Sequence, residues 1–512
     1  MFNIKNYSRD NIKNDILSGM VVAVALVPEA IAFSFIVGIN PIVGLYTAFL
    51  LGLVTSLIGG KPGMISGATG AVAVVLVGLA VESADILQKQ GLSGDELATG
   101  VLHYIFLSAI MAGIIQISFG LLKLGKFIRL VPLPAIYGFV NGLAIVIAMA
   151  QLKFFDSHDK VIYIIVAVTM AIMYYLPRYT KAVPAALVAI VALTIIVYTG
   201  SIDTLLIGDL ANLGEFKGQL PSFAIPDTLF SWQAMKVTLP FAVIVALVGL
   251  IESLLTLTVL DEMSGQRGSG NRECIAQGTG NVVCGFFGAM PGCAMIGQSI
   301  INFSSGGLGR LSSFTASVGL MVLVASLTDL LEIIPVGVLV GIMFMVSIGT
   351  FEWSSFGHLK KMPKSDAFVM LVVTIVTIFF DLAIAVIIGV IISALVFAWK
   401  HARIYARERI ESNGTKIYEL DGPLFFASVQ SFMDVFDMEN DPQNIVIDFK
   451  NARVMDSSGV EAIDKLTQKY EKSGRKLKLR HLSNDCKAVL KQAKAYVTYE
   501  EDDPEYKVAR DY

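Results

Sequence analysis

Two glutamates interrupt stretches of sequence that are otherwise apolar. Glu29 lies within residues 16–37 and Glu252 within residues 237–258, and both stretches read as membrane helices. An ionised carboxylate at bilayer depth is costly, so acids inside membranes usually mark pathways for ions or protons. The alternative is an acid that helps helices pack and stays protonated or hydrogen-bonded. Because the two glutamates occupy matched places in two halves of the chain, we favour a coupling-ion role for both, and we assign Thr256 to the same role.

Each glutamate is followed by a Pro-Gly pair and a run of small, uncharged residues. Pro62-Gly63 opens the first run, which ends at Ala71, and Pro291-Gly292 opens the second, which ends at Ser299. At membrane depth a glycine-rich interruption is tolerated only where it is buried in protein or lines a cavity. We therefore predict two broken helices. Their N-termini would offer unpaired N–H groups and positive dipole ends, which bind an anion without a full positive charge.

The predicted anion site draws groups from both breaks and from the first apolar segment. Its residues are Phe33, Ala68, Thr69, Gly70, Ala294, Met295, Gln298 and Ser299, with the backbones of Ala68, Thr69, Ala294 and Met295 as candidate donors. The alternative is that the small residues only allow close helix packing, and two runs in matched positions favour a site. An anion beside two carboxylates is repelled unless a cation neutralises them. The pattern therefore predicts an anion carried with H⁺ or Na⁺.

The composition of the whole chain sets the class of protein. Of 512 residues, 55% are hydrophobic and 16% are charged, whereas soluble domains carry about 25% charged residues. This excludes an ordinary soluble enzyme and indicates a polytopic protein embedded in a lipid bilayer. A net charge of −3 without a clustered basic face gives no reason to expect a nucleic-acid partner. The four cysteines are interpreted as packing residues, the five histidines are scattered, and no metal or cofactor is predicted.

The apolar part of the chain, 16–400, divides at charges, prolines and glycines into about fourteen α-helical spans. They are 16–37, 42–59, 67–81, 101–121, 133–152, 161–176, 184–199, 237–258, 275–290, 293–303, 314–328, 335–349, 367–381 and 383–399. Lysines and arginines gather in alternate loops, which predicts that the segment 1–15 and both termini are cytoplasmic. The polar segment 200–236 separates seven spans from seven, so we predict inverted repeats at about 16–200 and 230–400.

Beyond residue 400 the composition becomes that of a soluble protein. We predict a linker over 401–414 and a cytoplasmic domain over 415–512. Within it, 445–449 and 476–480 read as strands, and 459–472 and 484–493 as helices. Strands that alternate with helices indicate a small α/β sandwich.

With these motifs the chain resembles the SulP family of anion transporters, which includes sulfate and bicarbonate carriers of the solute-carrier type. The matching stretches are Val27–Phe33, Pro41–Tyr46, Ser66–Gly70, Glu252–Leu255, Asn271–Glu273 and Asp421–Phe426. The resemblance implies a seven-plus-seven inverted topology and a core domain that moves against a gate domain. It also implies substrate between the third and tenth spans, a C-terminal STAS domain and a homodimer. Asp456-Ser457-Ser458-Gly459 is similar to the phosphorylated loop of STAS proteins, which makes Ser457 and Ser458 regulatory candidates.

Two departures from the family pattern bear on which anion and which coupling ion are transported. Gln298 stands where many members have an arginine, which weakens the analogy to chloride exchangers and to the sulfate carriers that keep it. Ile296 stands where similar bicarbonate carriers have a threonine, which favours H⁺ over Na⁺. The expected function is a secondary active transporter of sulfate or bicarbonate in the inner membrane, working by elevator-type alternating access. The alternatives are a dicarboxylate–proton symporter, and a membrane sensor that signals through its STAS domain.

Overall fold

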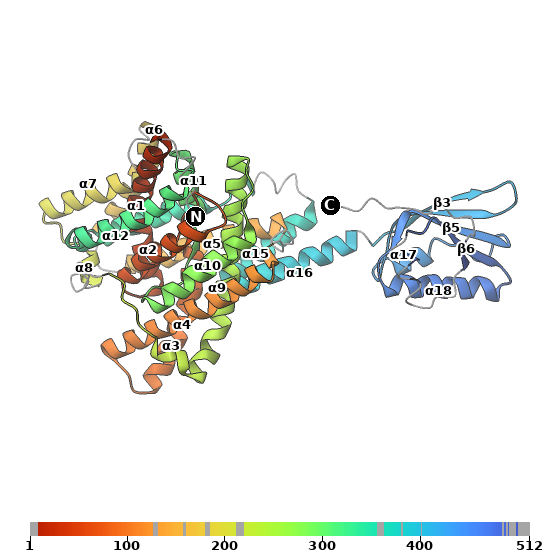
Figure 1. Cartoon of the computed structure of the whole chain (residues 1–512), viewed down its shortest axis with the longest axis horizontal. Coiled ribbons are helices and arrows are strands. Elements are labelled where there is room, and N and C mark those ends of the chain that lie inside the picture. Colours follow the sequence, from red (N-terminus) through yellow and green to blue (C-terminus); the bar gives the residue numbers. More distant parts are fainter. Residues whose placement is uncertain are drawn as a thin grey trace. The chain divides into compact units, whose positions relative to one another are not determined.

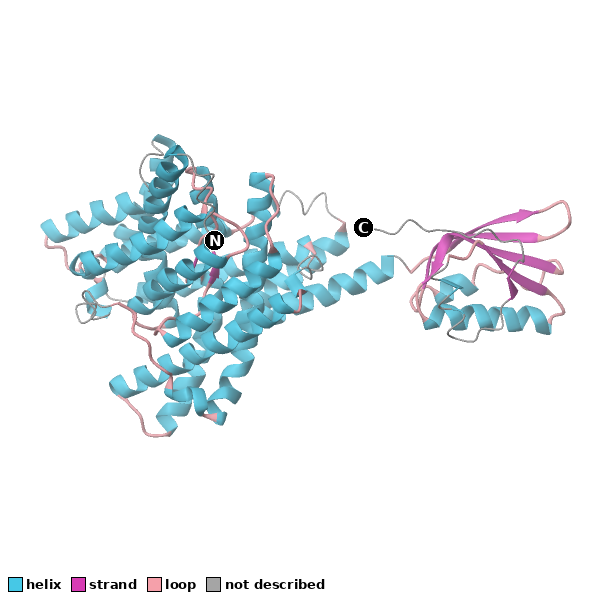
Figure 2. Cartoon of the chain, in the orientation of Figure 1, coloured by secondary structure: helices cyan, strands magenta, loops and turns pink. Residues whose placement is uncertain are grey.

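The computed structural model describes residues 9–125, 132–156, 160–179, 185–210, 220–355, 363–379, 382–400, 402–483, 486–487, 490 and 498–499. The chain forms two compact units, Met1–Val390 and Ile391–Tyr512, which are considered separately. Figure 2 shows that the first unit is built from helices and that the second contains a sheet.

The described helices up to residue 400 are labelled in Figure 1, and most of them overlap the predicted spans; the last, α16, crosses the boundary between the two units in the sequence. They are α1 (Arg9–Val37), α2 (Pro41–Ile58), α3 (Gly70–Lys89), α4 (Gly94–Leu121), α5 (Leu133–Gln151), α6 (Val161–Tyr179), α7 (Ala185–Thr199), α8 (Ile207–Leu210), α9 (Trp232–Ser264), α10 (Gly270–Phe286), α11 (Ile296–Ser304), α12 (Arg310–Glu332), α13 (Val336–Thr350), α15 (Lys364–Phe379) and α16 (Leu382–Lys400). Among the described residues, seven helices are long and apolar enough to cross a membrane, and three shorter helices are also apolar. Helix α1 already includes Arg9, so it begins well before the predicted start at residue 16.

These helices pack in two groups. The first bundle consists of α1–α4 and α9–α12, and the second of α5–α7, α13, α15 and α16. Small residues let the helices of a bundle approach closely, as they do in membrane proteins generally. Where α4 crosses α10, for example, a Cβ atom on Gly113 would lie 2.5 Å from the carbonyl oxygen of Gly278. The glycines in these helices are therefore contact residues.

The two Pro-Gly breaks meet inside the first bundle. Strand β1 (Ser66–Gly67) pairs with strand β2 (Cys293–Ala294) in antiparallel register, with Ser66 opposite Ala294 and Gly67 opposite Cys293. Helix α3 begins just after β1 and helix α11 just after β2. The prediction that both helices are interrupted is confirmed, and the pairing brings their N-termini to one place.

The second unit contains a five-stranded sheet. Its strands are β3 (Tyr405–Ile410), β4 (Lys416–Leu424), β5 (Asn444–Val454), β6 (Lys476–Arg480) and β7 (Thr498–Tyr499), in the order β3-β4-β5-β6-β7. β3 is antiparallel to β4, and the other neighbours are parallel. The helices are α17 (Val429–Met433) and α18 (Ser457–Lys472). The expected linker over 401–414 is therefore wrong in part, because β3 lies within it. The predicted helix 484–493 falls largely outside the described residues.

A buried carboxylate organises one side of this unit. Asp441, whose side chain is fully buried, accepts hydrogen bonds from the hydroxyls of Tyr418 at 2.7 Å and Tyr470 at 2.5 Å. Lys416 Nζ lies 2.7 Å from the same carboxylate. Burial raises the pKa of both tyrosines, and the negative charge of Asp441 raises each pKa further. The cluster thus joins β4, the segment before β5 and α18.

The raised tyrosine pKa values predict a loss of stability at alkaline pH. Above about pH 10 the unfolded chain releases the tyrosine protons that the folded domain keeps, so unfolding becomes easier as pH rises. The slope is up to about 1.4 kcal/mol per pH unit for each tyrosine. In the full-length protein, limited proteolysis of the second unit across alkaline pH should show this slope. The Tyr470→Phe protein should be less stable at neutral pH, and its free energy of unfolding should fall less steeply above pH 10. Tyr405→Phe changes an exposed position on β3 and should have the stability of the original protein at every pH. An unchanged slope in Tyr470→Phe would contradict the assignment.

Candidate functional site

The N-termini of α3 and α11 are the centre of the site. Their N-cap residues, Thr69 and Met295, have extended backbones, and neither side chain caps its helix. The amides of the first helical turns therefore have no partner within their own helix. Each N-terminus carries about half a positive charge from the helix dipole. Two uncapped ends beside one antiparallel strand pair form a place where a negative charge is stabilised.

Two of the predicted donors and one hydroxyl of the predicted site already have partners within the protein. The amide of Ala294 donates to Ser253 Oγ at 3.1 Å, and the amide of Met295 donates to the Ile65 carbonyl at 2.8 Å. The hydroxyl of Ser299 accepts from the Ile65 amide at 3.0 Å. These groups hold the two breaks together, as buried backbone groups must be paired, so the amides of Ala294 and Met295 are not the unpaired donors that the sequence led us to expect. The first-turn amides of α11, over 296–298, take their place as candidate donors.

One aromatic and one aliphatic side chain lie over the start of α3. A Cβ atom on Gly70 would come within 3.0 Å of Phe33 in α1 and 2.8 Å of Ile147 in α5. Phe33, which the sequence analysis included in the site, therefore packs against the start of α3. Ile147 packs there as well, from the second bundle. At the other helix end, a Cβ atom on Gly297 would meet no atom within 4 Å. The site is thus closed around Gly70 and has room at Gly297.

Glu29 is joined to the start of α11. Its position follows Pro28, which lies inside α1 and cannot donate a backbone hydrogen bond. Gln298 Nε2 donates to Glu29 Oε1 at 2.5 Å. Gln298 is 4% exposed, and its other amide atom, Oε1, is buried with no hydrogen-bond partner among the described residues. A buried polar atom without a partner is costly, so this atom marks a place for a ligand.

Glu252 is joined to both breaks through a thiol. Cys293 Sγ donates to Glu252 Oε2 at 2.9 Å, and it lies 3.1 Å from Thr69 Oγ1. The interpretation of Cys293 as a packing residue is therefore incomplete, since it links a glutamate of α9 to the N-cap of α3. Thr256 donates its hydroxyl to the Glu252 carbonyl at 2.8 Å, an ordinary bond within a helix. The structure thus brings together Glu29, Glu252 and both helix ends.

Glu273 is a fully buried carboxylate that the sequence reasoning did not pick out. It accepts from the Gly60 amide at 2.7 Å and from Gln277 Nε2 at 2.7 Å. Gln277 Nε2 also lies 2.8 Å from Ser66 Oγ in β1. Glu273 and Gln277 are fully buried and one turn apart on α10, and through Gly60 and Ser66 they fix the segment that contains β1. The i, i+4 spacing of an acid and an amide is the sequence signal that could have identified them.

The regulatory candidates lie in the second unit at the start of α18. Asp456 is the N-cap: its carboxylate accepts from the Gly459 amide at 2.9 Å and from the Phe426 amide at 2.9 Å. Ser457 is exposed and Ser458 is half-buried. In the described part of the chain, no group of three or more His, Cys, Asp or Glu side chains is arranged to hold a metal ion.

Comparison with known proteins gives consistent results for both units. The profile of the sulfate permease family matches residues 12–161 and 158–373, and that of the STAS domain matches residues 406–497. The putative sulfate transporter YbaR of Bacillus subtilis is 42% identical over 493 residues, covering 96% of this chain and 99% of YbaR.

Two solved structures of transporters resemble this one. The transmembrane domain of a cyanobacterial bicarbonate transporter, BicA, has a TM-score of 0.66 and 30% identity, covering 74% of this chain and 98% of BicA's domain. The murine anion transporter Slc26a9, solved in an inward-facing state, has a TM-score of 0.82 over 96% of this chain and 89% of its own. At 19% identity, that second likeness shows a shared fold.

Proposed function

The chain belongs to the sulfate permease family, and on that premise we propose that it is a secondary active transporter of a small inorganic oxyanion, bound between the N-termini of α3 and α11. The observation that carries this proposal is the convergence of two uncapped helix ends beside Glu29 and Glu252. The groups present bind and release an anion by charge and hydrogen bonding, and the proposal involves no covalent step.

The charge at the site favours an anion with a single negative charge. Two helix ends of about half a charge each supply roughly one positive charge in total. Gln298, at the first turn of α11, adds a dipole but no net charge. The single negative charge of bicarbonate equals this positive charge. Sulfate carries a second negative charge, which the helix ends do not balance and which protons on the glutamates would have to offset. A dicarboxylate carries two charges farther apart and fits less well.

The coupling ion in this proposal is H⁺, and the Gln298 amide is the device that couples it to the anion. An ionised Glu29 can only accept hydrogen bonds, so it draws the NH₂ end of the amide and leaves the carbonyl end, Oε1, unpartnered. A protonated Glu29 can donate to Oε1 once the amide rotates by half a turn, which leaves the NH₂ end unpartnered. The NH₂ end attracts an anion and the carbonyl end repels it. Protonation therefore raises anion affinity, and anion binding favours protonation equally.

Sodium fits the described site less well. Na⁺ is a hard cation and takes oxygen ligands, as Ca²⁺ and Mg²⁺ do. Beside Glu252 stands the sulfur of Cys293, and the hydroxyl of Thr256 is engaged with its own helix. Ile296 contributes no side-chain oxygen. This supports H⁺ as the coupling ion, with Na⁺ as the second candidate.

The transport movement is proposed to be of the elevator type, with the first bundle carrying the anion past the second. The strand pair and both glutamates belong to the first bundle, while Ile147 belongs to the second. Lys153, in the short 3-10 helix Leu152–Asp156 that continues α5, donates from Nζ to the Phe35 carbonyl of α1 at 2.8 Å, so it joins the second bundle to the first. A bifunctional thiol reagent with a cleavable spacer that bridges Phe35→Cys and Lys153→Cys should therefore stop uptake reversibly, and unimpaired uptake by fully cross-linked protein would refute this movement.

The remaining topology is also proposed. The chain would cross the inner membrane fourteen times as two inverted repeats, with both termini in the cytoplasm, and would form a homodimer. Light scattering of the detergent-solubilised protein gives the number of chains. Protease added to the outside of sealed inner-membrane vesicles of known orientation shows on which side of the membrane the second unit lies. A monomer, or a second unit cut from the periplasmic side, would refute the corresponding part.

The function is tested by uptake of radiolabelled bicarbonate and sulfate into proteoliposomes, with pH and Na⁺ gradients imposed separately. We expect accumulation driven by an inward H⁺ gradient, faster for bicarbonate than for sulfate. Accumulation that follows only the Na⁺ gradient would replace H⁺ by Na⁺. Absence of uptake for either anion under every gradient would favour the alternative of a membrane sensor that signals through the STAS domain.

Regulation is proposed at the start of α18. A phosphate on exposed Ser457 would lie near the positive end of that helix, worth about 0.3–1 kcal/mol at a surface, although the Asp456 carboxylate nearby opposes it. Intact-mass measurement of protein isolated from cells should reveal the added phosphate, and Ser457→Ala should abolish it and alter the rate of uptake. Ser458→Ala is the matched control for the neighbouring hydroxyl. Protein without phosphate and unchanged uptake in both variants would leave the loop with a structural role.

A further inference from the structure

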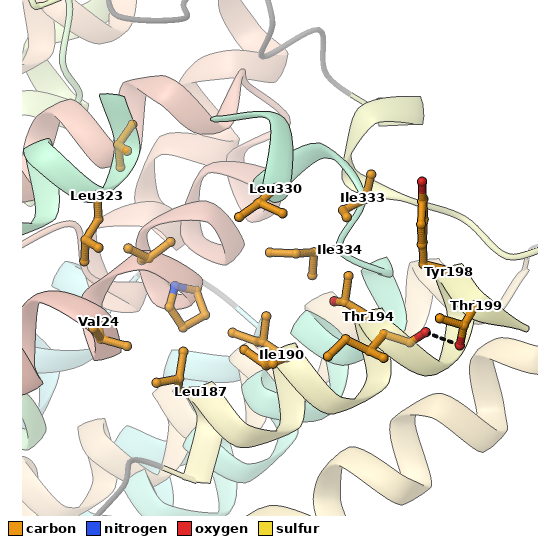
Figure 3. Close-up of a pocket in the computed structure, with 15 residues that line it drawn as sticks. Val24, Leu187, Ile190, Thr194, Tyr198, Thr199, Leu323, Leu330, Ile333 and Ile334 are labelled. Carbon is orange, nitrogen blue, oxygen red and sulfur yellow. Dashed lines mark hydrogen bonds between the residues drawn. The ribbon is translucent and has the colours of Figure 1, made fainter. Parts of the chain in front are cut away.

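An apolar cavity lies between α7 and the helices α1 and α12, and none of the predicted anion-binding residues lines it. Its volume is about 390 Å³, within the range of roughly 300–1,000 Å³ typical of ligand pockets. Figure 3 shows Ile190 and Thr194 on α7 facing Val24, Leu323 and Ile334 across the cavity. Apart from a few hydroxyls on α7, the lining is hydrocarbon.

The hydroxyls in the lining do not make this a polar site. Thr199 donates to the Ile195 carbonyl of its own helix at 2.7 Å, and Tyr198 is 71% exposed. Thr194 Oγ1 is buried and has no hydrogen-bond partner among the described residues. An ordered water needs two to four polar partners, and apolar cavities stay dry and take up apolar molecules instead. Water is therefore a poor occupant.

The cavity is continuous with the surface that faces lipid. Two of its lining residues on α7, Val191 and Ile195, are 48% and 55% exposed, and Leu330 at the end of α12 is 53% exposed. In a multi-pass membrane protein, apolar residues exposed on the spanning helices contact hydrocarbon chains. The medium that reaches this cavity is therefore the interior of the bilayer.

We propose that the cavity binds one acyl chain of a membrane phospholipid. The chain enters between α7 and α12 and lies against Pro28, the residue next to Glu29. It contacts both bundles, because α1 and α12 belong to the first and α7 to the second. If the bundles move as the proposed function requires, the chain stabilises the arrangement in which the cavity has this volume. Membrane lipids then set the rate of transport directly.

Photolabelling of the full-length protein tests this proposal. The protein is reconstituted with a phospholipid that carries a photoreactive diazirine in one acyl chain, irradiated, and analysed by mass spectrometry of its peptides. Label is expected on residues of α7 and α12 that line the cavity. Thr194→Trp, which fills the cavity, should lower that labelling at least fivefold, and Ile190→Phe is a milder filling variant in case the first fails to fold. Ile196→Trp, at an exposed α7 residue outside the lining, is the matched control and should leave labelling unchanged.

The outcomes separate this proposal from the proposed function. Thr194→Val removes the hydroxyl but keeps the shape of the side chain, so this protein should be labelled as strongly as the original. A loss of label would mean that the ligand binds through the hydroxyl, and it would overturn the proposal of an acyl chain. Equal labelling in the original protein and the filled variants would also overturn it. Labelling does not depend on transport, so a labelled cavity in a protein that moves no anion would sustain the lipid site and reject the transport proposal. Where uptake is present, the filled variants should differ from Ile196→Trp in rate.

Discussion

Replacing Glu29 by glutamine is expected to abolish uptake driven by an inward H⁺ gradient and to leave exchange down an anion gradient intact. In the original protein, anion affinity should rise as pH falls, because protonation of Glu29 lets Gln298 turn its NH₂ end toward the anion. A coupling free energy of about 1–3 kcal/mol corresponds to a change of roughly 5–150-fold in affinity. Glu29→Gln binds no proton at position 29, so its affinity should lose the part of the pH dependence that Gln298 transmits and keep only what Glu252 contributes. Apparent affinity measured by uptake at a series of external pH values gives the result.

Two companion variants locate the effect. Glu82→Gln changes an exposed glutamate of α3 and should behave as the original protein. Gln298→Leu removes the amide but keeps Glu29, so it should weaken anion binding and lose most of its pH dependence. If Gln298→Leu kept the full pH dependence, Glu29 would act on the anion by charge alone and the amide would not be the switch.

Adding one methyl group at Gly292 should have a comparably large effect by a different route. A Cβ atom there would lie 2.2 Å from the carbonyl oxygen of Gly67 and 2.9 Å from Leu51. Gly67 belongs to the strand pair, so its backbone cannot move without separating β1 from β2. Overpacking typically costs about 1–3 kcal/mol, and here it also displaces both helix ends. We expect Gly292→Ala to lose at least tenfold in uptake, with a lower yield of folded protein.

Gly349→Ala is the matched control, because a Cβ atom on that glycine of α13 would meet no atom within 4 Å. Uptake is to be normalised to the amount of protein that elutes as a single species in size-exclusion chromatography. Normal uptake and normal yield in Gly292→Ala would show that the approach of the two breaks is not needed for the site.

Structural features that depend on a few neighbouring residues could be predicted from the sequence. Pro-Gly pairs are typical of turns and loops, so both non-helical breaks could be predicted, and charges and glycines in the apolar sequence located most of the helices. Glu29 and Glu252 were recognisable because a charge in an apolar run is conspicuous. Strand β3 could not be recognised in this way: most of its residues are exposed, so it lacks the alternation of buried and exposed residues that marks a half-buried strand.

The detailed pairing at the site could not be predicted, because it joins residues far apart in the chain. Nothing near Cys293 in the sequence indicates that its thiol contacts Glu252, and nothing near Ala294 indicates that Ser253 takes its amide. Choosing the anion donors needed that information. Two strands of two residues each are also too short to leave a periodic pattern.

The pairing of β1 with β2 has a consequence for how the protein is made. Ser66 and Ala294 are 228 residues apart (294 − 66), so β1 is synthesised long before its partner. At about 5–20 residues per second, the ribosome needs roughly ten to forty-five seconds to supply β2. Until then Ser66 and Gly67 lack the strand partners that they have in the folded protein, and unpaired backbone groups are costly inside a bilayer. We therefore expect this segment to need shelter from lipid until the second half of the chain has been made.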